Sequence, residues 1–145
     1  MKVSEIMTDK VIPVGAGETA DVAARTLAQY NIGILPVCDP QGAICGLVTD
    51  RDLVTRCMAS GRLPAETRVS DIMTKQVVSV SPDMDVEQAA KLMASRQLRR
   101  LPVTENGQLK GILSLGDMAG KCQNPAAATV ALEGISAPLH RGSSW

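Results

Sequence analysis

Two short polar motifs hold the residues of this sequence that are best suited to binding chemistry. Thr49 and Asp52 stand three residues apart, and Ser114 and Asp117 repeat that spacing. Each motif follows an apolar run and precedes a helical pattern, so we expect it where a strand becomes a helix. The N–H groups at a helix start attract anions, a hydroxyl can donate to a phosphate oxygen, and a carboxylate can accept both hydrogens of a ribose diol. The motifs therefore predict the binding of a nucleotide-like ligand.

The same spacing also has a purely structural interpretation. A Thr or Ser three residues before an acidic residue forms a capping box, in which both side chains bond back to the backbone of the helix start. The two roles are compatible in a protein without ligand. Gly116 lies inside the second motif, where the missing side chain would let a ligand approach the backbone closely.

The two motifs belong to an internal repeat. Val3–Thr8 recurs as Val69–Thr74, and Leu35–Val37 recurs as Leu101–Val103, both 66 positions later. One residue is lost in the turn that follows, so the polar motifs are separated by 65 positions. Each copy of such a small unit has an apolar sheet face that the other copy can bury. We therefore expect a pseudo-twofold pair with two equivalent clefts at the junction.

Each copy predicts the element order β-α-β-β-α. The expected strands are residues 11–14, 34–38 and 44–49 in the first copy and 77–80, 101–104 and 109–114 in the second. The first helices begin near Ala20 and Val86, with Thr19 and Asp85 as N-cap candidates, and the second helices follow Thr49 and Ser114. The fold class is therefore α/β, with two β-α-β-β-α repeats packed with pseudo-twofold symmetry. Its predicted parts are a first repeat over residues 1–62, a second over 63–122 and a C-terminal extension over 123–145, with a short helix at 126–135 and a loose end at 140–145.

The composition limits the classes of function. The 145 residues include 15 Lys and Arg against 15 Asp and Glu, and 45% are hydrophobic. Nucleic-acid binding proteins usually carry a basic excess and aromatic stacking residues, whereas only 1% of this chain is aromatic. No apolar run reaches the roughly 20 residues of a membrane helix, and the N-terminus lacks the apolar stretch of a signal peptide. We expect a cytoplasmic protein that binds neither nucleic acid nor a membrane.

The side chains that could react are scattered. Cys38, Cys45, Cys57 and Cys122 form no C-x-x-C pair, and His140 is the only histidine. We therefore expect no metal site and cysteines that are buried or surface thiols, with a disulfide or redox pair as the alternative. Catalysis needs a nucleophile, an acid–base pair or a metal held together, and no such set is evident. The chain is predicted not to be an enzyme and to require no cofactor.

The ordered motifs resemble the CBS domain, and their pairing resembles a Bateman module of the stand-alone bacterial and archaeal type. The marks are the Ile-Met-Thr segment, the Leu-Pro-Val strand, the Gly before the third strand and the Thr/Ser-x-x-Asp after it, all present twice over about residues 1–121. The resemblance implies a regulatory module, usually a homodimer shaped as a flat disc, that binds AMP, ADP, ATP, S-adenosylmethionine or NAD as an effector. Its output would be a change of dimer shape, sequestration of the ligand or contact with an unidentified effector protein.

The resemblance further implies two clefts, each lined by both repeats. In the Asp117 cleft the ligand-binding residues would be Asp117, Ser114, Arg100, Ile112, Gly116, Ile12, Val14, Ile32 and Gly33. In the Asp52 cleft they would be Asp52, Thr49, Arg51, Leu47, Ile34, Val78, Val80, Leu98 and Arg99. Because aromatic residues are so few, adenine would lie between aliphatic side chains while backbone groups contact its edge.

The two copies differ at the expected phosphate position. Arg100 stands where the first copy has Ile34, and its planar guanidinium suits phosphate oxygens. The other cleft has Arg51 and Arg99 as phosphate partners instead. The alternative for Arg99 and Arg100 is a solvated strand end or an ion pair. We predict two unequal sites, with the Asp117 cleft the better one for a phosphorylated ligand.

A second class of function is also open. A dimerising interaction scaffold would bind no nucleotide and would respond to a partner or to oxidation of Cys38 or Cys45. Apolar residues follow both polar motifs and suit either core packing or, as the resemblance implies, a dimer interface: Leu53, Val54, Cys57, Met58 and Met118.

Overall fold

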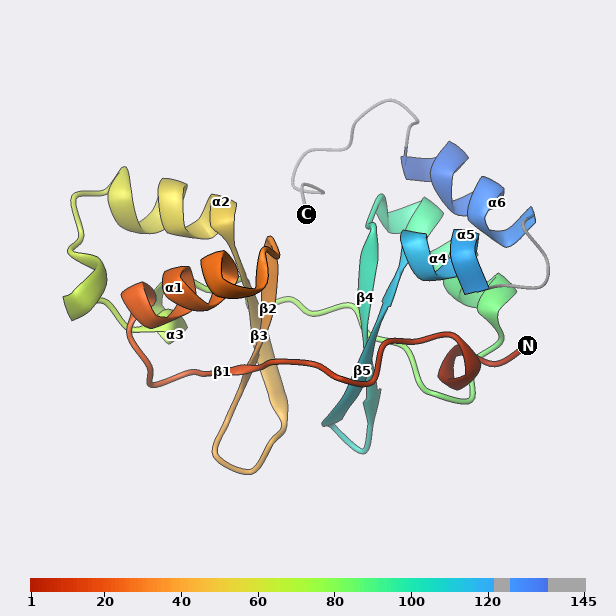
Figure 1. The fold of residues 1–145 in the computed structure, drawn as a ribbon, viewed down its shortest axis with the longest axis horizontal. Helices are drawn as coiled ribbons and strands as arrows, with labels where there is room; N and C mark the ends of the chain where they lie inside the picture. The colour runs from red at the N-terminus through yellow and green to blue at the C-terminus, as the bar shows by residue number, and fades with distance from the viewer. Residues whose placement is uncertain (122–125, 136–145) are drawn as a thin grey trace. The chain divides into compact units, whose positions relative to one another are not determined.

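The computed structural model describes residues 1–121 and 126–135, which form two compact units (Figure 1). The unit that contains Asp52, here the Asp52 unit, comprises residues 12–77 and 107–109. The unit that contains Asp117, here the Asp117 unit, comprises residues 1–11, 78–106 and those from 110 onward. The units therefore differ from the two sequence repeats, because the first residues of each repeat belong to the unit built mainly from the other repeat.

The Asp52 unit is built on a three-stranded sheet. Strand β1 (Val14–Gly15) lies parallel to β2 (Ile34–Cys38), which is antiparallel to β3 (Ile44–Thr49). The helical elements of this unit are α1 (Ala20–Tyr30), α2 (Asp50–Asp52), the π-helical η2 (Leu53–Met58), the 3-10 turn η3 (Pro64–Glu66) and α3 (Val69–Ile72).

The Asp117 unit repeats this plan around the pair of strands β4 (Arg100–Glu105) and β5 (Gln108–Ser114), of which residues 108–109 are grouped with the Asp52 unit. Its helical elements are the 3-10 turn η1 (Val3–Glu5), α4 (Val86–Arg96), α5 (Leu115–Lys121) and α6 (Ala126–Ile135). The predicted α/β class with two repeats of strands and helices is therefore confirmed, as is the short helix predicted over 126–135. The predicted loose end at 140–145 lies outside the described residues.

The first strand of each repeat is shorter than predicted. The expected strand 77–80 is wrong, since only Val80 pairs, in one parallel bridge with Val103. Val80 donates its N–H to the Pro102 carbonyl at 3.0 Å and accepts from Thr104 at 2.9 Å. Continuing this ladder backward would need an N–H from residue 102, and proline has none. Pro36 takes the same place beside β1, which explains why β1 begins only at Val14.

The first helix of each unit starts and ends at residues that the sequence marks. Asp85 caps α4 by accepting the Glu87 N–H at 3.1 Å. Thr19 occupies the same position before α1, but its hydroxyl donates to Asp21 instead of capping. That hydrogen bond is the main reason why the pKa of Asp21 lies below its ordinary value. Both helices end at a left-handed residue, Asn31 with φ 52° and Gln97 with φ 54°.

Each unit has its own hydrophobic core, which includes the first segment of the opposite repeat. We call Val3–Thr8 and Val69–Thr74 the lead segments. Val3 and Ile6 are 0% and 1% exposed in the core of the Asp117 unit, and Val69 and Ile72 are equally buried in the Asp52 unit. The burial of these apolar side chains stabilises the exchange of the lead segments. Among the described residues, no helix is long and apolar enough to cross a membrane.

Each lead segment ends in a short ladder with the third strand of its unit. Thr8 and Ile112 exchange two backbone hydrogen bonds of 2.9 Å, and Thr74 and Leu47 exchange two of 2.7 and 2.9 Å. The preceding residue of each strand is a glycine, Gly46 or Gly111. A Cβ at Gly46 would lie 2.9 Å from the Thr74 carbonyl oxygen, and one at Gly111 would lie 2.7 Å from that of Thr8. Both glycines are therefore needed for the close approach of the two backbones.

This approach predicts a large difference between two glycine-to-alanine variants. Gly46→Ala should lower the free energy of unfolding by about 1–3 kcal/mol, because the new methyl group must displace backbone. Gly120→Ala is the control, since nothing lies within 4 Å of its Cβ position, and it should raise stability by about 0.5–1 kcal/mol as a helical glycine. Urea unfolding of both variants measures the difference. A Gly46→Ala variant as stable as the parent would contradict the packing described.

Candidate functional site

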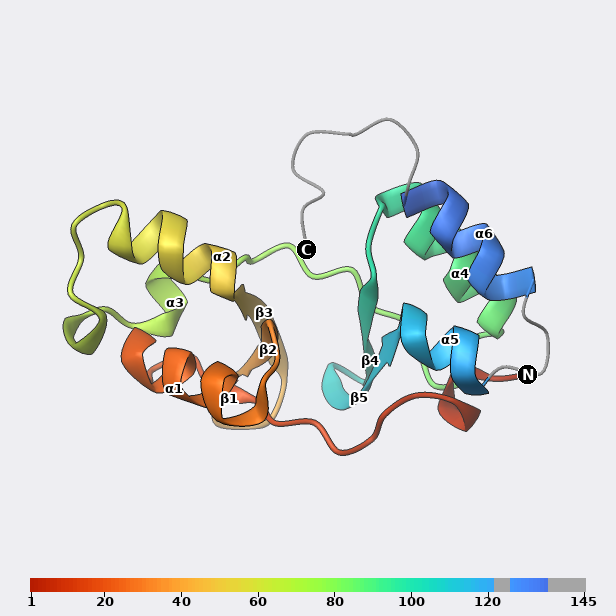
Figure 2. The ribbon, with the colours of Figure 1, turned by 45° about the horizontal axis from the view of Figure 1, so that its top comes forward.

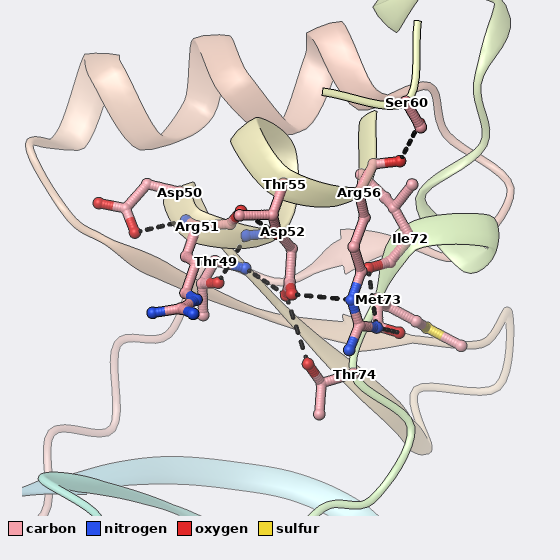
Figure 3. Close-up of polar contacts among 10 residues, drawn as sticks. All are labelled: Thr49, Asp50, Arg51, Asp52, Thr55, Arg56, Ser60, Ile72, Met73 and Thr74. Atoms are coloured by element: carbon pink, nitrogen blue, oxygen red, sulfur yellow. Dashed lines mark hydrogen bonds and ion pairs between the residues drawn. The ribbon is translucent and has the colours of Figure 1, made fainter. Parts of the chain in front are cut away.

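The predicted pair Thr49 and Asp52 forms a closed hydrogen-bonded ring at the junction of β3 and α2 (Figure 3). The Asp52 N–H donates to the Thr49 hydroxyl at 3.0 Å, and the Thr49 N–H donates to Asp52 Oδ2 at 3.0 Å. Both residues are buried, with exposures of 7% and 6%. This is the capping box that the spacing allows, and it holds the carboxylate in one orientation.

Asp52 also joins the two flanking segments of its unit. The Thr74 hydroxyl donates to Asp52 Oδ2 at 3.4 Å, and Arg56 Nε lies 3.6 Å from Oδ1 (Figure 3). Arg56 Nη1 in turn donates to the carbonyl oxygens of Met73 at 3.1 Å and Ile72 at 3.5 Å. The carboxylate and the guanidinium together therefore connect α2, η2 and the end of a lead segment.

Asp117 has the same surroundings in the other unit. Its N–H donates to the Ser114 hydroxyl at 3.0 Å, and the Ser114 N–H donates to Asp117 Oδ2 at 2.9 Å. The Thr8 hydroxyl donates to Oδ1 at 3.4 Å, and Lys121 Nζ lies 3.2 Å from the same oxygen. The same three parts therefore recur in each unit: a capping box, the threonine of a lead segment and a cation four residues after the aspartate. We call this set of contacts the constellation of each unit.

Four members of these constellations were not singled out by the sequence interpretation: Thr8, Thr74, Arg56 and Lys121. The signal was present, however, because Thr8 and Thr74 are 66 positions apart and Arg56 and Lys121 are 65 apart, which are the two offsets of the repeat. Each cation also stands four residues after its aspartate, the spacing of neighbours on one helix face. The exchange of the lead segments is what brings each threonine to the aspartate of the opposite repeat.

The remaining predicted residues divide between the units. Those of the Asp117 unit are Ile112, Gly116, Arg100, Arg99, Leu98, Val78 and Val80, and those of the Asp52 unit are Ile12, Val14, Ile32, Gly33, Ile34, Leu47 and Arg51. Each predicted cleft combines residues of both units. The structure brings the Gly33 carbonyl to the Asp50 N–H at 3.1 Å and the Arg99 carbonyl to the Leu115 N–H at 2.9 Å. By these bonds the Gly33 backbone flanks the Asp52 motif and the Arg99 backbone flanks the Asp117 motif, and the assignment of Gly33 to the Asp117 cleft and of Arg99 to the Asp52 cleft stays a prediction.

Burial separates the predicted wall residues into two groups. Val14, Val80, Leu47 and Leu98 are at most 4% exposed, so their side chains serve the packing of their own unit. The others have accessible surface, and the four with exposed side chains are Ile32, Arg51, Arg99 and Arg100. Contacts from the buried group to any ligand would therefore come mainly from the backbone.

Two of the described cysteines, Cys38 and Cys45, are poorly suited to redox chemistry. Cys38, Cys45 and Cys57 are free thiols. Burial raises the pKa of Cys38 and that of Cys45 above the ordinary thiol value, which lowers the fraction of reactive thiolate at neutral pH. Within residues 1–121 and 126–135, no three His, Cys, Asp or Glu side chains gather in a way that could hold a metal ion. Cys122 and His140 lie outside the described residues.

The bonds of Arg56 predict a specific stability effect. Arg56→Met should lower the free energy of unfolding by about 1 kcal/mol, because it removes an ion pair and two bonds to backbone carbonyls. The control is Arg25→Met, which removes only an exposed ion pair with Asp21 of 3.5 Å and should cost less than about 0.5 kcal/mol. Urea unfolding at low and at high salt measures the free energies of unfolding of both variants. Equal effects of the two variants would show that Arg56 does not hold the lead segment.

Comparison with known proteins identifies the repeated unit. The sequence profile of the CBS domain matches residues 3–59 and 69–123. The CBS domain-containing protein YhcV of Bacillus subtilis is 40% identical over 134 residues, which cover 92% of this chain and 94% of that protein. Hypoxic response protein 1 of Mycobacterium tuberculosis is 30% identical over 115 residues, or 79% of this chain and 80% of that protein.

Solved structures agree with the sequence match. The crystal structure of Hypoxic Response Protein I, which has two coordinated zinc ions, superposes with a TM-score of 0.77 at 29% identity, covering 83% of this chain and 98% of that one. A hexameric CBS-CP12 protein from bloom-forming cyanobacteria superposes with a TM-score of 0.70 at 33% identity, covering 85% and 72%. Two CBS profiles in tandem, relatives matched over most of their length and a shared fold lead to one conclusion. The chain belongs to the CBS-domain family, whose members are generally regulatory, and it carries two CBS domains as a tandem pair.

Proposed function

We propose that this CBS pair is a sensor module that binds an adenosine derivative, namely AMP, ADP, ATP, S-adenosylmethionine or NAD, as an effector rather than a substrate. The observation that supports the proposal most is the repeated constellation around Asp52 and Asp117. In each unit a hydroxyl and a carboxylate are held in a fixed orientation by their own capping box. Groups that are already oriented lose little entropy when they bind a ligand.

The acceptor capacity of the carboxylates supports a specific mode of ribose binding. A carboxylate offers about four acceptor positions, and Asp52 already uses them for the Thr49 N–H, the Thr74 hydroxyl and Arg56. Two diol hydroxyls need two positions, so one present contact must give way. The 3.4 Å hydroxyl contact of Thr74 is long for an O–H···O bond, and a threonine that releases it can accept from the ligand instead. Thr8 would act in the same way at Asp117.

The two sites are proposed to differ in their preference for phosphate. Arg100 is exposed at the start of β4, where the other unit has Ile34 at the start of β2. A guanidinium fork pairs with two phosphate oxygens, so the site of Asp117 would favour phosphorylated ligands. The aliphatic residues of the predicted sets would enclose the adenine.

We further propose that the module is a homodimer. On η2, Val54 and Met58 are 55% and 65% exposed, which is unusual for large apolar side chains close together on one segment. The hexameric CBS-CP12 protein offers a precedent for assembly among proteins of this fold. Sedimentation velocity at micromolar concentration tests the proposal, and a monomer throughout would refute it.

The second candidate function is an interaction scaffold that binds no nucleotide. The observation in its favour is that the capping box, the threonine and the cation already give both carboxylates partners within the protein. The motifs would then stabilise the helix starts and nothing more. A redox-responsive form of this scaffold is disfavoured by the raised pKa values of Cys38 and Cys45.

Thermal unfolding with a panel of ligands separates the two functions. AMP, ADP, ATP, S-adenosylmethionine and NAD are each added at rising concentration, with GMP and ribose 5-phosphate as controls. A ligand at about 100 times its dissociation constant adds about 2.7 kcal/mol to the free energy of unfolding. The sensor predicts a shift with at least one adenosine compound that exceeds the shifts of both controls. The scaffold predicts no shift with any of them.

A further inference from the structure

Helix α6 packs against the elements that carry the proposed Asp117 site. It runs alongside α4 and also contacts α5, the helix that contains Gly116 and Asp117 (Figure 2). Ala127 and Ala131 of α6 are 4% and 0% exposed and share one hydrophobic core with Met118, the residue after Asp117. The helix is therefore part of the packing that supports α5.

The last turn of α6 meets the last turn of α4. A Cβ at Gly134 would overlap Ala94, so the two backbones approach as closely as a glycine allows. At the end of the same turn of α4, the Gln97 side-chain amide donates to the Gly134 carbonyl at 3.3 Å. Gln97 is the left-handed residue that ends α4, and it is 5% exposed. Helix α6 therefore holds the residue at which the chain turns from α4 toward β4.

This turn leads to the groups that the proposed site uses. Arg99 and Arg100 follow Gln97 after one intervening residue, and Arg100 begins β4. The Arg99 carbonyl accepts the N–H of Leu115, the first residue of α5, at 2.9 Å. The turn that precedes Arg100 and the helix that contains Asp117 are therefore bonded to each other, and α6 contacts both.

The Asp52 unit contains the same turn and shows what it looks like without such a helix. The Gly33 carbonyl accepts the Asp50 N–H at 3.1 Å, which is the equivalent bond. Asn31 stands where the second repeat has Gln97, and both are left-handed, with φ of 52° and 54°. Asn31 is exposed, however, whereas Gln97 is buried. Among the described residues, the turn of the Asp52 unit thus has the same backbone conformation but no covering helix.

We infer that α6 positions the Asp117 site for a phosphorylated ligand by holding the turn before Arg100. The inference rests on the proposed function, and it adds to Arg100 itself a second reason why the two sites are unequal. Gln97 and Gly134 are positioning residues, since they act through the turn and not by touching the ligand. A turn that is already held in place loses less entropy when the ligand binds. Because such coupling is reciprocal, a ligand in the Asp117 site holds α6 more firmly on α4.

Two substitutions in the full-length chain weaken the packing of α6 to different degrees. Gln97→Asn shortens the side chain that reaches the Gly134 carbonyl, and it introduces the residue that the first repeat has in the same conformation. Gly134→Ala forces α6 away from α4. Each should lower the affinity of the tighter, Asp117 class of site for ATP by about fivefold or more and leave the other class unchanged. Leu132→Ala is the control on α6, since Leu132 is 50% exposed, and it should change neither affinity. Isothermal titration calorimetry measures both classes.

Two further measurements separate positioning from a general loss of stability. In a double-mutant cycle, Gly134→Ala and Arg100→Met together should weaken ATP binding by less than the product of their separate fold-changes, because both act through Arg100. In the parent, ATP at a concentration that fills only the tighter class should slow hydrogen exchange in α6 more than in α1. Exchange in α6 that does not respond to ATP would overturn the inference.

The titrations also distinguish the inference from the proposed function. If the parent binds ATP in two classes and both α6-weakening variants keep the tighter class unchanged, the inference is overturned and the proposed function stands. An equal loss in both classes would also overturn the inference, because α6 would then support the fold as a whole. If the parent binds no adenosine compound, the proposed function fails and the inference fails with it.

Discussion

Replacing Asp117 with alanine is expected to weaken the binding of a phosphorylated adenosine ligand by about 100-fold or more. The substitution removes an ionised acceptor for two diol hydroxyls, and a hydrogen bond to a charged group contributes about 1.5–3 kcal/mol. Isothermal titration calorimetry with AMP and ATP measures the change. The effect should be larger than that of Asp52→Ala, because Arg100 makes the Asp117 site the preferred one for phosphate.

This variant also loses its capping box, so a matched control is needed. Ser114 still caps the helix, but its N–H loses its acceptor, Asp117 Oδ2, which should lower the free energy of unfolding by about 1–3 kcal/mol. Asp85→Ala also removes a carboxylate that accepts a backbone N–H at a helix start, that of Glu87, at a position outside both proposed sites. It should cost similar stability and leave ligand affinity unchanged. If Asp117→Ala retains the affinity of the parent, the carboxylate is only a helix cap and the assignment of the site fails.

Replacing Arg100 with methionine is expected to lower affinity for AMP and ATP by about tenfold while leaving affinity for adenosine nearly unchanged. The reason is that the guanidinium and a phosphate form a bidentate, charge-assisted pair. Adenosine has no phosphate, so its binding does not include this contact. The affinity of the parent for ATP should also fall with salt more steeply than that of the variant. Calorimetry at two salt concentrations measures both effects.

Arg96→Met provides the matched control for Arg100. Arg96 is an exposed arginine at the end of α4, and its replacement changes the net charge by the same amount without touching the proposed site. It should leave both affinities unchanged. An Arg100→Met variant that loses affinity for adenosine and ATP equally would show that Arg100 supports the fold of the site rather than the phosphate. No change for either ligand would leave it a solvated strand end.

The local features of the fold follow directly from the sequence. The Thr49-to-Asp52 spacing predicts a capping box, and the structure contains that box in both copies. The Gly-containing turns and apolar runs predict β2, β3, β4 and β5 to within one residue. Such features depend on residues that are close in sequence, so periodicity and capping chemistry are sufficient to find them.

The features that depend on distant residues could not be predicted in the same way. Nothing local in Val3–Thr8 indicates that its apolar residues pack in the unit of the opposite repeat. Consequently the hydrogen bond from the Thr8 hydroxyl to Asp117, which lies 109 residues later in the chain, was not anticipated. The shortened first strands had a readable cause, since Pro36 and Pro102 lack the N–H that a longer parallel ladder needs. Recognising that cause requires knowing which strand lies beside the proline.

The packing of α6 on α4 illustrates a further limit of sequence interpretation. The helix itself is predicted by its composition, but its partner α4 lies outside the segment, and the contact depends on Gly134 meeting Ala94. Periodicity likewise predicts the same burial for both copies of this helix, whereas Ala24 and Ala28 of α1 are exposed and their counterparts Ala90 and Ala94 of α4 are buried and half-buried.

The most direct test of the account is the titration of the full-length protein with AMP, ATP and S-adenosylmethionine by isothermal calorimetry. The account predicts saturable binding of at least one of them, with two classes of site of unequal affinity, and loss of the tighter class in Asp117→Ala. Absence of binding for all three up to millimolar concentration, with the protein folded and Asp117→Ala differing from it only in stability, would contradict the account. The constellations around Asp52 and Asp117 would then be helix caps of a scaffold.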